Sequence, residues 1–168
     1  MLGIDPGLTR CGFAVVDAAK RSKLTALSLG VFRTSPSEEI PSRLADLQRD
    51  IADLIDEFTP QVVAVERLFF QVNVRTAMSV GQASGVVLSQ AALAGCRVVQ
   101  YTPNEVKQAV AGYGAADKAQ VQRMVQQRLQ LSSPPKPADA ADAAALALCF
   151  LSHEPVGRAI SKALGGTR

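Results

Sequence analysis

The sequence predicts a single α/β domain, built on a mixed sheet that carries helices on its faces. The first 34 residues contain three strand-like segments with short connections between them, a pattern typical of an antiparallel meander. Beyond them, segments with helical spacing alternate with short apolar segments of strand type, which favours two further, parallel strands. At 168 residues the chain has the length of one domain.

The strands are predicted from short runs rich in apolar and β-branched residues. The predicted segments are residues 2–5, 12–17, 24–34, 62–66 and 96–101. In the third segment Leu27, Leu29 and Val31 alternate with polar or small residues. The fourth is apolar throughout until its final glutamate, as in a strand covered on both faces. The first is short for a central strand, since about five or six residues are usual.

The helices are predicted from apolar residues that recur every three or four positions. The predicted segments are residues 43–58, 74–94, a short helix from 103 to the glycine at 112, 117–131 and 138–153. The last segment is apolar on nearly every side, so it should be buried. Residues 1–153 are therefore expected to form the domain, and residues 154–168 a flexible C-terminal tail.

The composition points to a cytoplasmic protein that keeps its cysteines reduced. No apolar run reaches the roughly 18 residues of a membrane span, and the N-terminus lacks the pattern of a secretory signal. Cys11, Cys96 and Cys149 have no metal-binding or redox spacing. We therefore expect buried thiols at these positions.

The charge of the chain is unevenly distributed. Between residues 67 and 136 there are eight basic and two acidic side chains, whereas residues 1–60 have seven basic and nine acidic ones. A basic half is compatible with a polyanionic partner such as nucleic acid, although a solvated surface explains such an excess equally well.

Four carboxylates lie at the ends of apolar segments, where an unpaired buried charge would be costly. Asp5 and Glu66 end predicted strands, and Asp139 and Asp142 share one face of the first turn of the last helix. Oxygen ligands without a histidine or cysteine suit Mg²⁺ or Mn²⁺. The alternative is that Asp5 caps a turn and the pair on the helix caps its N-terminus, which leaves Glu66 poorly explained.

Five segments of the chain resemble the signature segments of the RuvC family of bacterial Holliday-junction resolvases. They are Gly3-Ile4-Asp5-Pro6-Gly7, Ala64-Val65-Glu66-Arg67, Asn104-Glu105-Val106-Lys107, Asp117-Lys118-Ala119-Gln120-Val121 and Ala138-Asp139-Ala140-Ala141-Asp142-Ala143. The resemblance implies an RNase H-like fold and a homodimeric endonuclease of DNA recombination and repair. Such an enzyme would cut a four-way junction by symmetric paired nicks that leave 5′-phosphate and 3′-hydroxyl ends.

The resemblance also implies roles for individual residues. The four acids would hold two Mg²⁺ ions per subunit, with Mn²⁺ as a substitute, and Asp142 makes the site all-carboxylate where some members have histidine. Lys107 and Lys118 would act beside the cut phosphate, and Phe69 would contact bases near the junction centre. The expected DNA contacts are Phe69, Arg67, Asn73, Arg75, Lys107 and Lys118.

Two of these assignments have ordinary structural alternatives. Both lysines could be plain surface residues, and Phe69 could anchor its loop on the core. Gly81, Gly85 and Ser89, spaced four apart, would allow another backbone to approach, either within the fold or in a homodimer. The family also implies a branch-migration helicase partner, RuvA and RuvB.

Other functions remain open from the residues alone. A different RNase H-like nuclease would cut RNA–DNA hybrids or structured RNA, and a non-catalytic protein would bind junctions without cutting them. The cluster of acids argues against the second of these, because it would repel phosphates. An actin-like ATPase shares the opening strand and turn, but it needs two such domains.

Overall fold

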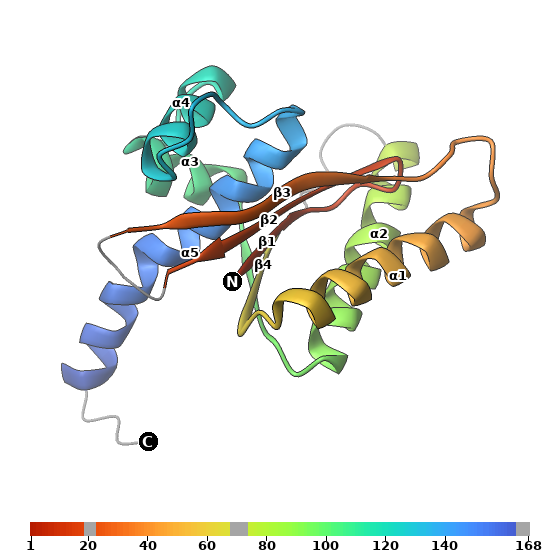
Figure 1. Ribbon diagram of the computed structural model, residues 1–168, viewed down its shortest axis with the longest axis horizontal. Coiled ribbons are helices and arrows are strands. Elements are labelled where there is room, and N and C mark those ends of the chain that lie inside the picture. Colours follow the sequence, from red (N-terminus) through yellow and green to blue (C-terminus); the bar gives the residue numbers. More distant parts are fainter. Residues whose placement is uncertain (19–22, 68–73, 164–168) are drawn as a thin grey trace.

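A five-stranded mixed sheet forms the centre of the protein (Figure 1). The computed structural model describes the backbone of residues 1–18, 23–67 and 74–163, and their side chains except those of residues 74–76 and 155–163. The strands are β1 (Leu2–Asp5), β2 (Arg10–Asp17), β3 (Thr25–Arg33), β4 (Val62–Glu66) and β5 (Arg97–Tyr101), in the order β3-β2-β1-β4-β5. The first three pair antiparallel, and β4 and β5 continue the sheet in parallel, which confirms the predicted mixed sheet.

The short strand β1 occupies the middle of the sheet. It pairs with β2 on one side and β4 on the other, so its backbone is bonded along both edges. Leu2 and Ile4 are fully buried. The amino group of Met1 donates a hydrogen bond of 2.8 Å to the carbonyl oxygen of Val16 and adds a further contact to this end of β1.

The helices divide between the two faces of the sheet (Figure 1). They are α1 (Ile40–Phe58), α2 (Val74–Leu93), α3 (Pro103–Ala111), α4 (Lys118–Arg128) and α5 (Ala138–Ala163). The side chains of α1 and α2 form one apolar cluster with the sheet, and those of α3, α4 and α5 form the other. No helix among the described residues is long and apolar enough to cross a membrane.

Three helix boundaries differ from the prediction by three residues or more. Helix α4 ends at Arg128 rather than at residue 131. Helix α1 begins at Ile40 rather than residue 43, because Pro41 fits the first turn, where its missing N–H has no partner to lose. Helix α5 continues to Ala163 instead of ending at residue 153, so most of the predicted C-terminal tail is helical. Residues 154–168 have no clear apolar period, and Pro155 disfavours helix, so local patterns do not predict the extension. Residues 164–168 lie outside the described part of the chain.

The long helix α5 packs directly on the backbone of β1 and β2. A Cβ atom at Gly3 would overlap the carbonyl oxygen of Ala143, and one at Gly12 would overlap that of Asp139. Helix α5 therefore packs closer to the sheet than it could if Gly3 and Gly12 carried side chains. Its residues from Ala140 to Phe150 are buried except for Asp142, which confirms the predicted buried helix.

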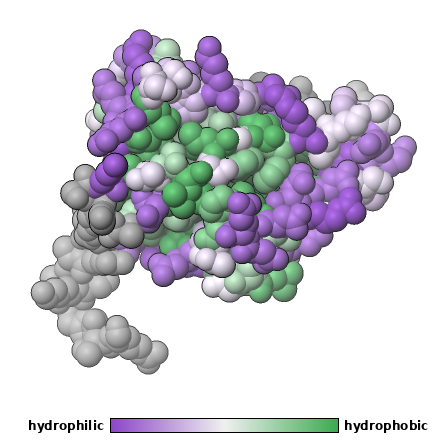
Figure 2. All heavy atoms as spheres, viewed as in Figure 1, coloured by the Kyte–Doolittle hydropathy of each residue, from purple (hydrophilic) through white to green (hydrophobic). Residues whose placement is uncertain are grey.

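The edge strand β3 is less covered than its alternating pattern suggested. Leu27 is 54% exposed, and Leu29 and Val31 are only partly buried. Figure 2 shows apolar side chains gathered over β3 in the middle of this face, bordered by hydrophilic residues. An edge strand has one neighbour, so alternation in its sequence does not ensure that its apolar side chains are covered.

Candidate active site

Asp5 and Glu66 lie side by side at one edge of the sheet. Strands β1 and β4 are parallel, and Ile4 is the register partner of Val65. The next residue of each strand is therefore an acid at the same carboxyl end. The predicted meeting of these two acids follows from the parallel pairing.

Helix α5 brings the other two acids to this edge. Asp139 lies in its first turn, and Asp142 follows one turn later on the same face. The close seat of the helix on Gly12 places the backbone of Asp139 against β2, next to β1. Asp139 and Asp142 both repel a negative charge on Asp5, so all four acids share one electrostatic environment.

Three of the acids open into a common cleft. The cleft has a volume of about 330 Å³ and is lined by Asp5, Glu66 and Asp142. Lys107 and Lys118 line it as well. Apolar side chains complete the wall: Pro103, Val106, Val121, Ala145 and Leu146. The predicted acids and both predicted lysines thus meet around one hollow, except for Asp139, which lies beside it.

Asp5 and Glu66, the two acids on strands, lie in an environment that is unfavourable for negative charge. Burial raises the pKa of Asp5 to about 7, and repulsion from Glu66, Asp142 and Asp139 adds to the rise while Lys118 opposes it. Burial likewise raises the pKa of Glu66, with Asp142 adding to the effect. Buried carboxylates that repel one another favour the arrival of a cation.

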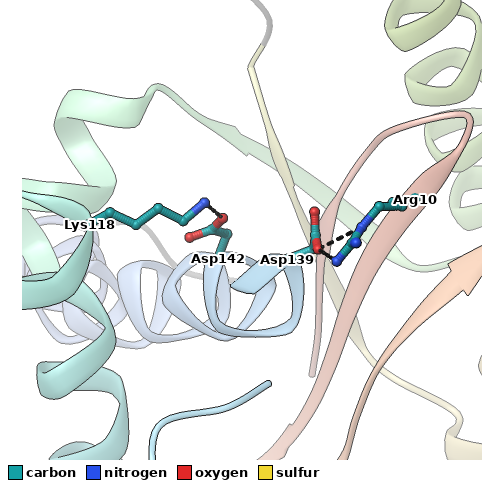
Figure 3. A network of polar contacts seen from close by, with 4 residues as sticks. All are labelled: Arg10, Lys118, Asp139 and Asp142. Carbon is teal, nitrogen blue, oxygen red and sulfur yellow. Dashed lines mark hydrogen bonds and ion pairs between the residues drawn. The ribbon is translucent and has the colours of Figure 1, made fainter. Parts of the chain in front are cut away.

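Each helix-borne acid already has a cationic partner (Figure 3). The Nζ atom of Lys118 donates a 2.6 Å hydrogen bond to Oδ2 of Asp142, and this bond raises the pKa of Lys118. Arg10 donates to Oδ2 of Asp139 through Nε, at 3.0 Å, and through Nη2. Sequence reasoning missed Arg10. Its position two residues before Gly12, on the same face of β2, was the available signal.

The donor set suits a hard divalent cation, although the side chains are not yet arranged around one. Within residues 1–18, 23–67 and 77–154, no three acidic, histidine or cysteine side chains lie close enough together to hold a metal ion as they stand. Asp139 and Asp142 are instead paired with Arg10 and Lys118. Carboxylate oxygens alone, with burial that raises the pKa of two of them, fit Mg²⁺ or Mn²⁺.

The remaining predicted DNA contacts are only partly visible. Arg67 is exposed directly after β4, where its backbone N–H donates to the carbonyl oxygen of Tyr101 at 2.7 Å. Phe69 and Asn73 lie outside the described residues. Arg75 belongs to α2, but its side chain is not described. All four assignments, that of Arg67 included, remain predictions.

The glycine-containing face of α2 is open. A Cβ atom at Gly81 or Gly85 would meet nothing within 4 Å, so no other element of the described chain packs closely there. Ser89 is exposed on the same helix. Met78 and Leu93 are 62% and 80% exposed. Within the described residues, no element of the fold packs closely against these small residues, and their role in a homodimer remains a prediction.

The class of the protein follows from the strand order of the sheet and from the acids at the carboxyl ends of β1 and β4. This fold and this acidic site are those of an RNase H-like nuclease, in which α5 supplies the third and fourth acids.

Comparison with known proteins identifies the family within this class. The sequence model of the family described as "Crossover junction endodeoxyribonuclease RuvC" matches residues 1–150. The RuvC of Thermobifida fusca is 51% identical over 166 residues, covering 96% of this chain and 91% of that protein. The RuvC of Salinispora arenicola is 54% identical over 151 residues, covering 90% and 86%.

A solved structure gives the same answer. The structure described as "T. thermophilus RuvC in complex with Holliday junction substrate" superimposes with a TM-score of 0.88 at 39% identity, covering 93% of this chain and 94% of that one. The chain belongs to the RuvC family of crossover junction endodeoxyribonucleases.

Proposed function

We propose that this chain resolves four-way DNA junctions by metal-dependent, symmetric nicking of two strands. The observation that carries the proposal is the meeting of Asp5, Glu66, Asp139 and Asp142 at one sheet edge, beside Lys107 and Lys118. Membership of the RuvC family supplies the substrate, because a solved relative is described in complex with a Holliday junction. The same membership disfavours RNA–DNA hybrids and structured RNA as substrates.

The four acids are proposed to hold two Mg²⁺ ions per subunit, with Mn²⁺ as a substitute. Bound there, the ions would lower the pKa of the attacking water and stabilise the leaving 3′ oxygen, giving 5′-phosphate and 3′-hydroxyl ends. The chain contributes the geometry: Asp5 and Glu66 are anchored on rigid neighbouring strands. The apolar wall formed by Val106, Val121 and Leu146 lowers the local dielectric around the reacting phosphate.

Lys107 and Lys118 are proposed to act on the scissile phosphate. Both line the cleft that contains the acids. Lys118 reaches Asp142 in the DNA-free protein, and a phosphate bound in the cleft would offer its ammonium group a second anionic partner. A positive charge so placed stabilises the charge that develops on the phosphate in the transition state. Arg67, Phe69, Asn73 and Arg75 are proposed as further DNA contacts, as the family resemblance implies.

The open face of α2 is proposed as the homodimer interface. Gly81, Gly85 and Ser89 leave room for a second backbone, and the exposed Met78 and Leu93 would be covered by it. A twofold dimer presents two equivalent sites, which suits a junction with twofold symmetry. RuvA and RuvB as partners and a cytoplasmic location are proposed from family membership.

The test is cleavage of a synthetic junction with a mobile core and one labelled strand at a time. With Mg²⁺ we expect nicks at symmetric positions in two strands of like polarity, which DNA ligase can seal. Plain duplex and an RNA–DNA hybrid of the same sequence serve as controls. Intact junctions, equal cutting of duplex, or preferential cutting of the hybrid would contradict the proposed function.

A further inference from the structure

Arg10 is a cation beside the proposed active site that the proposed mechanism does not use. Its guanidinium donates to Oδ2 of Asp139 through Nε, at 3.0 Å, and through Nη2. The two side chains are 41% and 27% exposed, so solvent reaches the pair. In Figure 3 Arg10 and Lys118 lie on opposite sides of the Asp139 and Asp142 pair, so each cation draws one acid outward.

The backbone of Asp139 is held on the sheet, whereas its carboxylate is bound by the side chain of Arg10. Gly12 seats the carbonyl group of Asp139 on β2. Arg10 projects from the same strand face two residues earlier. Asp139 is absent from the described residues that line the cleft, whereas Asp5, Glu66 and Asp142 are present. Rotation of the Asp139 side chain, without movement of α5, would bring the fourth carboxylate to the cleft.

We propose that Arg10 is a displaceable counter-ion that exchanges Asp139 for a DNA phosphate when a divalent cation binds. The proposal rests on the proposed function, because it takes Asp139 as a metal ligand. A guanidinium and a metal ion compete for the same carboxylate oxygen, so binding of one weakens binding of the other. Arg10 has only donors, and a phosphate oxygen near the cleft is the matching acceptor once Asp139 has turned away.

A neighbouring arginine also disfavours an unpaired positive charge on Arg10. Arg33 is the register partner of Arg10 across β2 and β3, so both side chains project from the same face of the sheet. Like charges directly opposite one another are unfavourable. Repulsion from Arg33 therefore favours an anion next to Arg10 both before and after the exchange: first Asp139, then a phosphate. Arg33 is exposed, and it makes a matched control because the same charge can be removed without touching Asp139.

The first test measures Mn²⁺ binding without DNA, by electron paramagnetic resonance of the free ion. Arg10→Gln should bind Mn²⁺ more tightly than wild type, by roughly three- to tenfold, because a competing cation is gone. Arg33→Gln should change the affinity by less than about twofold, since its charge is solvated and screened. Equal tightening in both variants would show a general charge effect and overturn the proposal, as would no change in Arg10→Gln.

The second test measures affinity for a four-way junction in EDTA and in Ca²⁺. Arg10→Gln should lose at least about three times more affinity in Ca²⁺ than in EDTA, because the wild-type guanidinium reaches the phosphate only after the metal has taken Asp139. Arg33→Gln should lose the same factor in both buffers. Equal losses for Arg10→Gln in the two buffers would overturn the phosphate half of the exchange.

Two further measurements separate the possible failures. Arg10→Lys keeps the charge but not the paired donors, so it should lie between wild type and Arg10→Gln in both tests. It also serves if Arg10→Gln does not fold, as judged by thermal unfolding. If wild type neither binds Mn²⁺ nor cuts junctions, the proposed function fails. If wild type does both but Arg10→Gln matches it in Mn²⁺ affinity, only the role of Arg10 is wrong.

Discussion

At the scale of single residues, the carboxylate of Asp5 carries the greatest consequence. It stands at the end of a strand bonded on both edges, with Glu66 beside it and two more acids above it. Burial and these neighbours raise the pKa of Asp5 to about 7. Burial and like charges therefore favour the protonated form of Asp5, whereas its proposed role as a metal ligand requires the ionised form.

Replacing this carboxylate by an amide should separate binding from chemistry. In Asp5→Asn the shape is kept but a ligand oxygen with full charge is lost, so junction cleavage should fall by at least about 10³-fold, as when a transition-state contact is removed. Junction affinity in Ca²⁺ should stay within about threefold of wild type. Asp53→Asn, an exposed acid on α1, is the control and should cut normally. Cleavage by Asp5→Asn at more than a tenth of the wild-type rate would show that the assignment is wrong.

The raised pKa of Asp5 also predicts how stability depends on pH without metal. The folded protein keeps a proton on Asp5 up to about pH 7, whereas the unfolded chain releases it near the ordinary value of 3.8. The folded state therefore binds more protons between these values, and its stability falls as the pH rises through this window. The same proton should weaken metal binding below pH 7.

Urea unfolding in EDTA at pH 5 and pH 8 measures this effect. The stability of Asp5→Asn relative to wild type should rise by about 3 kcal/mol between the two pH values, because wild type loses about 1.4 kcal/mol for each of the two pH units below the pKa of Asp5. Excess Mg²⁺ should remove most of the difference by stabilising wild type. A constant difference across this range would show that Asp5 titrates normally.

At the scale of elements, the seat of α5 on the sheet decides where two of the four acids lie. Gly3 and Gly12 belong to different strands, and each leaves space for a carbonyl group of the same helix. The helix is rich in alanine where it faces the sheet, which keeps the distance short. The positions of Asp139 and Asp142 are thus set by two glycines outside the helix.

Adding a methyl group at this seat should damage both stability and catalysis. Gly12→Ala would push the first turn of α5 outward, which should cost about 1–3 kcal/mol in the free energy of unfolding. The displaced acids should lower the rate of junction cleavage by about tenfold or more. Denaturant unfolding and single-turnover cleavage measure the two effects.

Gly114 provides the matched control for this change. A Cβ atom there would lie 3.9 Å from the nearest other atom, the carbonyl oxygen of Asn104, which is an ordinary contact. Gly114→Ala should therefore cut junctions at the wild-type rate and unfold within about 0.5 kcal/mol of wild type. If Gly12→Ala behaved in the same way, the close seat of the helix would be irrelevant to the site.

At the scale of the whole molecule, the open face of α2 is the proposed homodimer interface. It lies on the other face of the sheet from α3, α4 and α5 (Figure 1). The proposed DNA-cutting cleft is lined by residues of α3, α4 and α5 together with the ends of β1 and β4. A dimer formed through α2 would therefore leave uncovered the cleft residues that belong to α3, α4 and α5.

A large charged side chain at the centre of this face should prevent dimerisation. Gly85→Arg should elute as a monomer in size-exclusion chromatography with light scattering, since the room for a partner backbone is filled. Gln127→Arg introduces the same charge at an exposed position of α4 and should remain dimeric. With the paired sites separated, Gly85→Arg should give single nicks in place of symmetric pairs. Dimers of Gly85→Arg would contradict the proposed interface.

Sequence reasoning reached most of the elements because their signals are local. Helical spacing, continuous apolar runs and turn residues report on neighbours along the chain, so the strand at residues 62–66 and the start of the helix at residue 138 were predicted to the residue. It also singled out the four acids, because charge at the end of an apolar segment is costly wherever the segment lies. The resemblance to the RuvC family, carried by five short segments, was confirmed by the comparisons.

Only the tertiary structure showed which of those acids are paired with cationic side chains. The bond from Arg10 joins residues 129 positions apart, and that from Lys118 joins residues 24 apart. No periodicity along the chain reports such pairs, because they depend on how α5 crosses the sheet. By itself the sequence indicated the four candidate acids and the family. The parallel pairing of β1 and β4 brought Asp5 and Glu66 together, and the packing of α5 against two glycines placed Asp139 and Asp142 beside them, each next to a cation.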